Sequence, residues 1–283
     1  RSGAKGRRLM RYGFILPGGD ARVVAESARA AEAAGWDGFF IADCVWSVDP
    51  WVSLTAAAML TERIELGTML TPVSRYRPWS LAAQTATLDD LSGGRVILAV
   101  GLGALDTGFA EFGEETDRKT RAELMDEGLA IIDGLWRGQP FNFDGKHYHV
   151  RPTTFAPPPA PVREPRIPVW VVGAWPRPKS MDRVARWDGL LPDKIGADGQ
   201  REDYTPDDLR AMAAYLAARR PADAAPLDII VEGETPGDDS AAARAVIQPL
   251  REAGATWWLE SRWGDGRDAE AQERIHQGPP RGE

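Results

Sequence analysis

The chain has 283 residues, 43% of them hydrophobic, which suits a single large α/β domain with a sizeable core. Its 34 basic and 42 acidic residues form no long block of one sign, which argues against nucleic acid and against an anionic membrane surface as partners. The one cysteine, Cys44, excludes an intrachain disulfide and a cysteine-built metal site, and it fits a reducing, cytoplasmic setting.

The first half of the chain alternates between apolar strands and helices with clear start signals. Strands are predicted at 11–16, 38–43, 64–70 and 96–102, and helices at 20–35, 51–61, 78–91 and 118–136. Asp20 is expected to cap the first helix and Asp49, followed by Pro50, the second. Residues 1–9 are basic, and the apolar run behind them is too short for a signal peptide or a membrane span, so we interpret them as a leader or an expression remnant.

The second half continues the alternation after an excursion. Residues 141–150 alternate around Asp144-Gly145, which predicts a hairpin, and a proline-rich connector covers 152–168. Strands follow at 169–173, 189–192, 228–233 and 256–261, separated by helices at 179–187, 206–220 and 240–253. Eight strands, each followed by a helical stretch, predict an α/β fold, a (β/α)₈ TIM barrel in one domain over 10–263, with the hairpin before strand five and a C-terminal helix or tail at 264–283. A doubly wound open sheet is the alternative.

In such a barrel, ligands bind where the strands end, so the residues that follow each strand are candidates for the site. Asp43 and Cys44 follow the second strand; Asp43 either orients or ionises a substrate group or caps a loop, and Cys44 is either part of the site or a small buried filler. Glycines end strands four and five, where backbone amides could approach a phosphate, although glycine at a strand end is more commonly a turn residue. Asp193, Glu232 and Glu260 lie at or just past the ends of strands six, seven and eight.

Aromatic residues and histidines add weaker signals. Of the eleven tryptophans, several fall near predicted strand ends, among them Trp46, Trp79 and Trp175, where they could wall an apolar pocket for a planar ring. None of the three histidines falls at a strand end, so no metal site is predicted. No glycine motif of a nicotinamide-binding domain is present.

Ordered blocks of this sequence resemble the luciferase-like monooxygenase family from residue 10 to about 263. The most specific are Leu66-Gly67-Thr68-Met69-Leu70-Thr71-Pro72, Arg75-Tyr76-Arg77-Pro78, Asp89-Asp90-Leu91-Ser92-Gly93-Gly94-Arg95, Val100-Gly101-Leu102-Gly103, Phe143-Asp144-Gly145-Lys146-His147-Tyr148 and Trp187-Asp188-Gly189. The resemblance implies a (β/α)₈ barrel that holds FMN, or in many relatives the deazaflavin coenzyme F-420 (F420), at the mouth of the barrel.

By position, the resemblance assigns cofactor contacts to strands three, four and five. They are Thr68 and Met69, at a cis non-proline peptide that supports the flavin ring, Gly101, Leu102 and Gly103, and, on the phosphate side, Gly173, Ala174 and Trp175. The family usually places a histidine behind the acidic residue after strand two. Here Cys44 stands behind Asp43, which leaves the acid-base assignment open.

Three functions are compatible with these residues. The first is a flavin-dependent oxidoreductase with FMN, acting on a small organic substrate near Asp43 and Cys44, with Trp46, Trp79 and Glu260 in the substrate pocket; as an oxygenase it would need a separate flavin reductase. The alternative is an F420-dependent dehydrogenase or reductase that transfers hydride without oxygen, with Arg75, Arg77 and Arg177 as candidates for binding the polyglutamate tail. The third is a non-catalytic flavin-binding paralogue. The resemblance also implies a homodimer.

Overall fold

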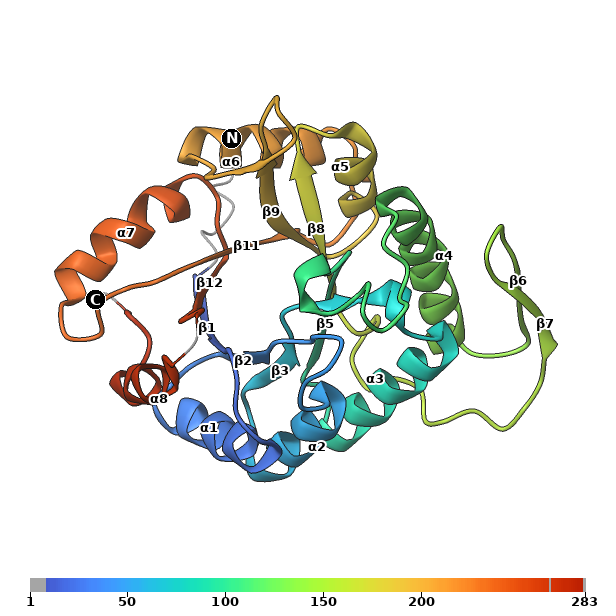
Figure 1. Ribbon diagram of the computed structural model, residues 1–283, viewed down its shortest axis with the longest axis horizontal. Helices are drawn as coiled ribbons and strands as arrows, with labels where there is room; N and C mark the ends of the chain where they lie inside the picture. Colours follow the sequence, from blue (N-terminus) through green and yellow to red (C-terminus); the bar gives the residue numbers. More distant parts are fainter. Residues whose placement is uncertain (1–8, 265, 282–283) are drawn as a thin grey trace.

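The computed structural model describes residues 9–264 and 266–281, and these form a closed parallel β-barrel inside a ring of helices (Figure 1). The barrel strands, in the order in which they pair around the ring, are β1 (Arg11–Leu16), β2 (Gly38–Ile41), β3 (Glu65–Thr68), β5 (Val96–Gly101), β8 (Val169–Trp175), β9 (Gly189–Ile195), β11 (Asp228–Gly233) and β12 (Trp257–Glu260). β1 pairs in parallel with both β2 and β12, which closes the ring. The (β/α)₈ prediction is therefore confirmed, and the open sheet is excluded.

The helices connect successive barrel strands across the outside of the barrel, except the last, which follows the final strand. They are α1 (Ala21–Ala33), α2 (Pro50–Leu60), α3 (Pro78–Ser92), α4 (Arg118–Arg137), α5 (Pro178–Val184), α6 (Pro206–Ala217), α7 (Ser240–Glu252) and α8 (Asp268–Gln277). The predicted start signals are in place, because the Asp20 side chain accepts hydrogen bonds from two backbone amides of α1 and Asp49 accepts one from α2. Among the described residues, no helix is long and apolar enough to cross a membrane.

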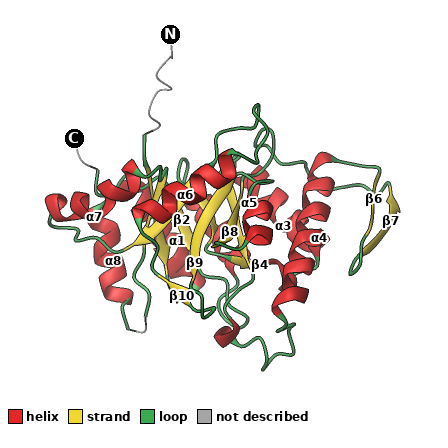
Figure 2. Cartoon of the chain, turned by 90° about the horizontal axis from the view of Figure 1, so that it is seen from above, coloured by secondary structure: helices red, strands yellow, loops and turns green. Residues whose placement is uncertain are grey.

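Several shorter elements lie outside the barrel strands and the helices of the ring. They are β4 (Thr71–Pro72), β10 (Arg201–Glu202) and the 3₁₀ turns η1 (Val73–Arg75) and η2 (Leu105–Thr107), which the sequence patterns did not predict, and the hairpin β6 (Phe141–Asp144) and β7 (His149–Thr153), which they did. The hairpin stands outside the helical ring beside α4 in both views (Figures 1 and 2). It therefore lies away from the mouth of the barrel.

The two ends of the chain differ in how they are anchored. The interpretation of residues 1–9 as a leader falls on residues 1–8, which lie outside the described residues, and on Leu9, whose side chain is exposed. At the other end, α8 packs against α1, and the Trp36 indole donates a hydrogen bond of 2.9 Å to the Ile275 carbonyl. The C-terminal helix thus takes the eighth helix position of the ring.

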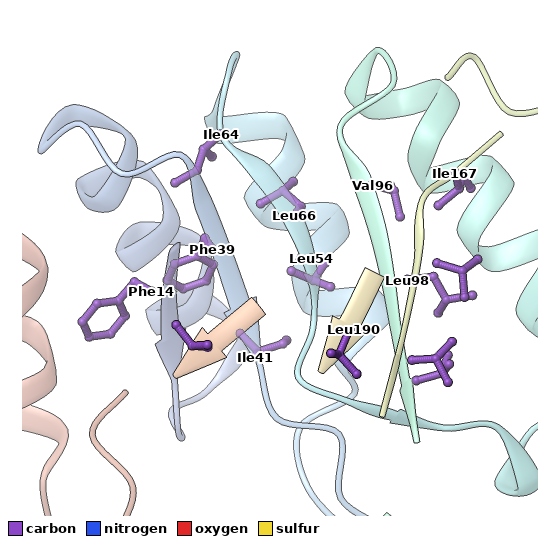
Figure 3. Packing of buried hydrophobic residues seen from close by; sticks show 14 of the residues in the cluster. Phe14, Phe39, Ile41, Leu54, Ile64, Leu66, Val96, Leu98, Ile167 and Leu190 are labelled. Carbon is purple, nitrogen blue, oxygen red and sulfur yellow. The ribbon is translucent and has the colours of Figure 1, made fainter. Parts of the chain in front are cut away.

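The core consists of two layers, because alternate strand residues point to opposite sides of the barrel wall. Outward residues such as Phe14, Phe39 and Leu66 pack under the helices (Figure 3). Inward residues form an aromatic plug, in which the ring centroids of Phe40 and Trp170 are 5.5 Å apart and those of Trp170 and Trp257 are 5.1 Å apart. The plug fills the lower part of the barrel and leaves only its carboxyl mouth for a ligand.

Candidate active site at the mouth of the barrel

A cavity of about 2910 Å³ opens at the carboxyl ends of the strands. Its lining comes from the ends of β2, β3, β5, β8, β9 and β11 and from the segments that follow them. Ligand pockets commonly measure about 300–1,000 Å³. This cavity therefore has room for a large cofactor together with a substrate.

Asp43 lies on the cavity wall two residues after β2, and its carboxylate is fully enclosed by its neighbours. Arg75 donates a hydrogen bond of 2.8 Å to Oδ1, and the Tyr76 hydroxyl donates one of 2.9 Å to Oδ2. Burial raises the pKa of Asp43 to about 6, against the opposing effects of Arg75, Tyr76 and Thr71, which favour the ionised form. Asp43 can therefore take up and release a proton near neutral pH.

Cys44 also lines the cavity and is half-buried. Burial, together with the charge of Asp43, raises the pKa of its thiol. The sulfur is then protonated at neutral pH, so the residue presents a small, weakly polar surface rather than a thiolate nucleophile.

The cis peptide after β3 lies one residue later than predicted, and β3 itself ends at Thr68 rather than at residue 70. The cis peptide joins Met69 and Leu70 rather than Thr68 and Met69, because Thr68 still pairs in register with Ile41 as the last residue of the strand. The Thr68 hydroxyl lies 2.6 Å from that of Thr71 and is buried away from the cavity. Met69 and Leu70 line the cavity and form an apolar surface there. Of the two residues predicted to contact the cofactor, Met69 thus lies on the cavity, whereas Leu70 takes the place expected for Thr68.

The end of β5 and the loop after it line the cavity as expected, and two glycines there have no space for a side chain. A Cβ at Gly101 would lie 2.9 Å from the Leu70 side chain. Gly103 has a φ of +77°, and a Cβ there would lie 2.8 Å from both Phe109 and Pro72. The buried Arg121 donates a hydrogen bond of 2.7 Å to the carbonyl of Leu102, which holds the loop against α4.

Of the three residues predicted at the end of β8, only Ala174 lines the cavity. A Cβ at Gly173 would meet Met181 of α5, and the Trp175 ring packs against Tyr215 of α6 with centroids 5.7 Å apart. Three consecutive strand residues cannot all face inward, because the side chains alternate. Gly173 and Trp175 therefore face the helices.

The structure does not bring the three predicted substrate-pocket residues into the cavity. Trp46 is 82% exposed and stacks on Phe112 beside the mouth. Trp79 lies in the first turn of α3 and contacts Tyr148 in the turn of the hairpin, on the outer side of the barrel. Glu260 is fully buried between Arg262 and Arg274, where it also accepts a hydrogen bond of 2.8 Å from the Thr235 amide. A position near a strand end did not determine in which direction these side chains point.

Charged residues divide the cavity into two walls. The basic wall, from the start of α4 and the β8–α5 segment, has seven cations and four carboxylates: Arg118, Lys119, Arg121, Arg177, Lys179, Arg183 and Arg186, with Asp117, Glu123, Asp126 and Asp182. The acidic wall, from β9 to β11, has four carboxylates and two cations: Asp193, Glu202, Asp203 and Glu232, with Lys194 and Arg201. Most of these residues were missed because they lie on helices and loops rather than at strand ends.

Several basic-wall cations have no acidic partner. Arg183 and Arg186 both pair with Asp126 at 2.7 Å. Within the part of the chain that the structure describes, no carboxylate lies within 4.0 Å of Arg118, Arg177 or Lys179. Of the tail-binding candidates, Arg177 is thus available to an anionic ligand, whereas Arg75 is occupied by Asp43 and Arg77 does not line the cavity. The described residues contain no cluster of metal ligands.

Comparison with known proteins adds four findings. The model of the family described as luciferase-like monooxygenase matches residues 10–281. An F420-dependent glucose-6-phosphate dehydrogenase of Beutenbergia cavernae is 36% identical over 216 residues, which cover 71% of this chain and 60% of that protein. A solved F420-dependent secondary alcohol dehydrogenase, in complex with an F420-acetone adduct, superposes with a TM-score of 0.75 at 17% identity, covering 96% of this chain and 98% of the other. The FMN-bound oxygenating constituent of 3,6-diketocamphane monooxygenase from Pseudomonas putida gives 0.71 at 18% identity, covering 95% and 96%.

Proposed function

Because this chain belongs to the luciferase-like monooxygenase family, we propose that it is an F420-dependent oxidoreductase that moves a hydride between a small organic substrate and the deazaflavin without using oxygen. The sequence alone put FMN first. Relatives named as F420-dependent dehydrogenases favour the deazaflavin, while FMN proteins share only the fold at low identity. The chain spans about 60% of the length of the Beutenbergia cavernae relative, so the activity is argued from the residues of this cavity.

The basic wall is the observation that carries the choice of cofactor. F420 extends from its phosphate into a tail of several carboxylates, whereas FMN ends in one phosphate. Three cations without acidic partners among the described residues, Arg118, Arg177 and Lys179, line the cavity and are available to such a tail. The glycines at 101 and 103 keep side chains out of the same space, and Met69 and Leu70 offer an apolar surface to a planar ring. The residues present therefore fit F420.

Asp43 is the group that we assign to proton transfer. Bound F420 would supply a ring carbon that accepts or returns a hydride. When an alcohol is oxidised, its carbon loses that hydride and its hydroxyl loses a proton, and we assign the ionised Asp43 carboxylate to accept this proton. Because the carboxylate is enclosed and only the backbone of Asp43 borders the cavity, the proton must reach it through an intervening group. Arg75 and Tyr76 hold the carboxylate in place for this role. A separate flavin reductase has no part in this scheme.

Parallel anaerobic titrations with F420 and FMN test the proposal, with quenching of cofactor fluorescence as the readout. We expect F420 to bind at least tenfold more tightly than FMN. R177A/K179A should weaken F420 binding at least tenfold, because it removes two cations that have no acidic partner. The control is R29A, which removes an exposed α1 cation outside the cavity. Tighter binding of FMN would return the oxygenase to first place, and binding of neither cofactor would favour the non-catalytic paralogue.

A further inference from the structure

Glu232 extends the acidic wall toward the interior of the barrel. It is the last residue but one of β11, and Ile230, two residues earlier on the same face of the strand, also lines the cavity. The Glu232 side chain reaches accessible cavity space rather than packing against the helices. It therefore presents a carboxyl group to whatever occupies this part of the cavity.

The groups around Glu232 leave its carboxylate open to a ligand. No cation of the described residues lies within 4.0 Å of it. Burial raises the pKa of Glu232, while Arg201 and the Trp263 indole favour its ionised form. Burial and the charge of Glu232 also raise the pKa of Tyr204, so that phenol stays protonated beside the carboxyl group. The group thus retains hydrogen-bond acceptor capacity that protein partners do not use.

The cations of the acidic wall are already engaged. Arg201 donates a hydrogen bond of 2.7 Å to Asp193. Lys194 lies 3.1 Å from Asp208 and 3.6 Å from Glu202. A phosphate or carboxylate on this wall would therefore meet Glu232 without an unpaired cation to offset its charge, in contrast to the basic wall.

We propose that Glu232 selects the substrate by charge: this protein accepts alcohols whose second polar group is a hydroxyl or an amine, and it rejects those that carry a phosphate or a carboxylate there. The proposal rests on the proposed function, which places the anionic cofactor along the basic wall and leaves the acidic wall to the substrate. It predicts that glucose 6-phosphate, the substrate in the name of the Beutenbergia cavernae relative, is a poor substrate for this chain.

Three alcohols of one skeleton test the selection. 2-Propanol, 1-amino-2-propanol and lactate share a CH₃–CHOH group and differ in the charge of the third substituent. Reduction of F420 at pH 8, where the amine is cationic, gives kcat/KM for each. We expect the amine to be used at least as well as 2-propanol, and lactate at least tenfold less well. Lactate or glucose 6-phosphate as the best substrate would overturn the proposal.

A pair of variants assigns the effect to Glu232. E232Q should lower the ratio of kcat/KM for the amine to that for lactate at least tenfold, because it removes the charge and keeps the shape. E234Q makes the same change two residues later, where Glu234 pairs with Arg267 at 2.7 Å and does not line the cavity, so the ratio should not change. An unchanged ratio in E232Q would contradict the proposal, provided that far-ultraviolet circular dichroism shows both variants folded.

A second readout needs neither turnover nor cofactor, and so separates this inference from the proposed function. Trp263 lines the cavity beside Glu232. The fluorescence of this residue is obtained by subtracting the emission of W263F from that of the wild type. The ratio of quenching by caesium to quenching by iodide should be higher in the wild type than in E232Q, because the carboxylate attracts cations and repels anions. Equal quenching ratios would refute charge selection even if F420 binds, whereas a failed F420 titration with unequal ratios would refute only the proposed cofactor.

Discussion

Asp43 carries the sharpest prediction at the scale of single residues. Burial raises its pKa to about 6, and only the ionised form can accept the substrate proton. The kcat/KM for alcohol oxidation should therefore rise as the pH increases through about 6 and then level off. D43N should lower kcat at least a hundredfold at pH 8 with F420 binding unchanged, and a D43N enzyme with normal kcat would remove Asp43 from proton transfer.

Tyr76 tests the cause of that pKa. Its hydroxyl donates to Asp43 Oδ2 at 2.9 Å, and this bond favours the ionised carboxylate. Y76F removes the bond, so the midpoint of the pH profile should move to a higher pH. Y148F is the matched control, because Tyr148 lies in the turn of the hairpin between β6 and β7 and does not line the cavity. A midpoint that stays in place or falls would show that another group controls the profile.

At the same scale, the sequence predicted the site only in part. It placed Asp43 and Cys44 correctly on the cavity, because a residue that directly follows a barrel strand has little freedom of position. It misplaced Trp46, Trp79 and Glu260, since the direction of a side chain in a loop depends on partners that come from distant parts of the chain, such as Phe112 and Arg274. Alternation along β8 would have excluded Gly173 and Trp175 once Ala174 was taken as inward.

Elements were predicted well where a local signal sets their ends. Asp20, Asp49 and the glycine at 93 mark helix boundaries through hydrogen bonds or a left-handed backbone that depend on a few adjacent residues. The short strands β4 and β10 had no such signal, because they exist only by pairing with β5 and β9. The walls of the cavity follow the same pattern: the strand ends were predictable, and the helix and loop residues were not.

The β5–η2 loop provides a prediction at the scale of an element. G103A places a Cβ 2.8 Å from Phe109 and Pro72 at a φ of +77°, so it should distort the loop and weaken F420 binding at least tenfold. G113A is the matched control, because its φ of +71° gives a similar backbone cost, roughly 1–2 kcal/mol, with nothing within 4 Å of the new Cβ. Both should lower the midpoint of urea unfolding. If they weaken cofactor binding equally, the loop does not contact F420.

At the scale of the whole molecule, the alternation of strands and helices was enough to predict the architecture. Parallel strands need a crossover for each connection, and the helices that provide the crossovers cover the outside of the sheet. Closure was harder to foresee, because it rests on the pairing of β1 with β12, which are separated by nearly the whole chain. The mouth of the cavity follows from closure, since the carboxyl ends of all the parallel barrel strands meet at one rim.

For the oligomeric state of the protein, we propose a homodimer formed through α2. This helix exposes Val52, Met59 and Leu60, with Val52 at 66% and Met59 at 67% exposure, on the outer face of the barrel. Stable interfaces bury roughly 800 Å² on each partner around an apolar centre, and a second copy of the chain would provide the same apolar face in return. Sedimentation at micromolar concentration should give twice the 30.9 kDa mass of one chain.

Two variants test whether α2 forms the interface. V52E/M59E should give a monomer, because two carboxylates would be buried in the interface. V246E on α7, across the barrel in Figure 1, should remain dimeric. A monomeric wild type, or a dimer that survives V52E/M59E, would exclude α2 as the interface.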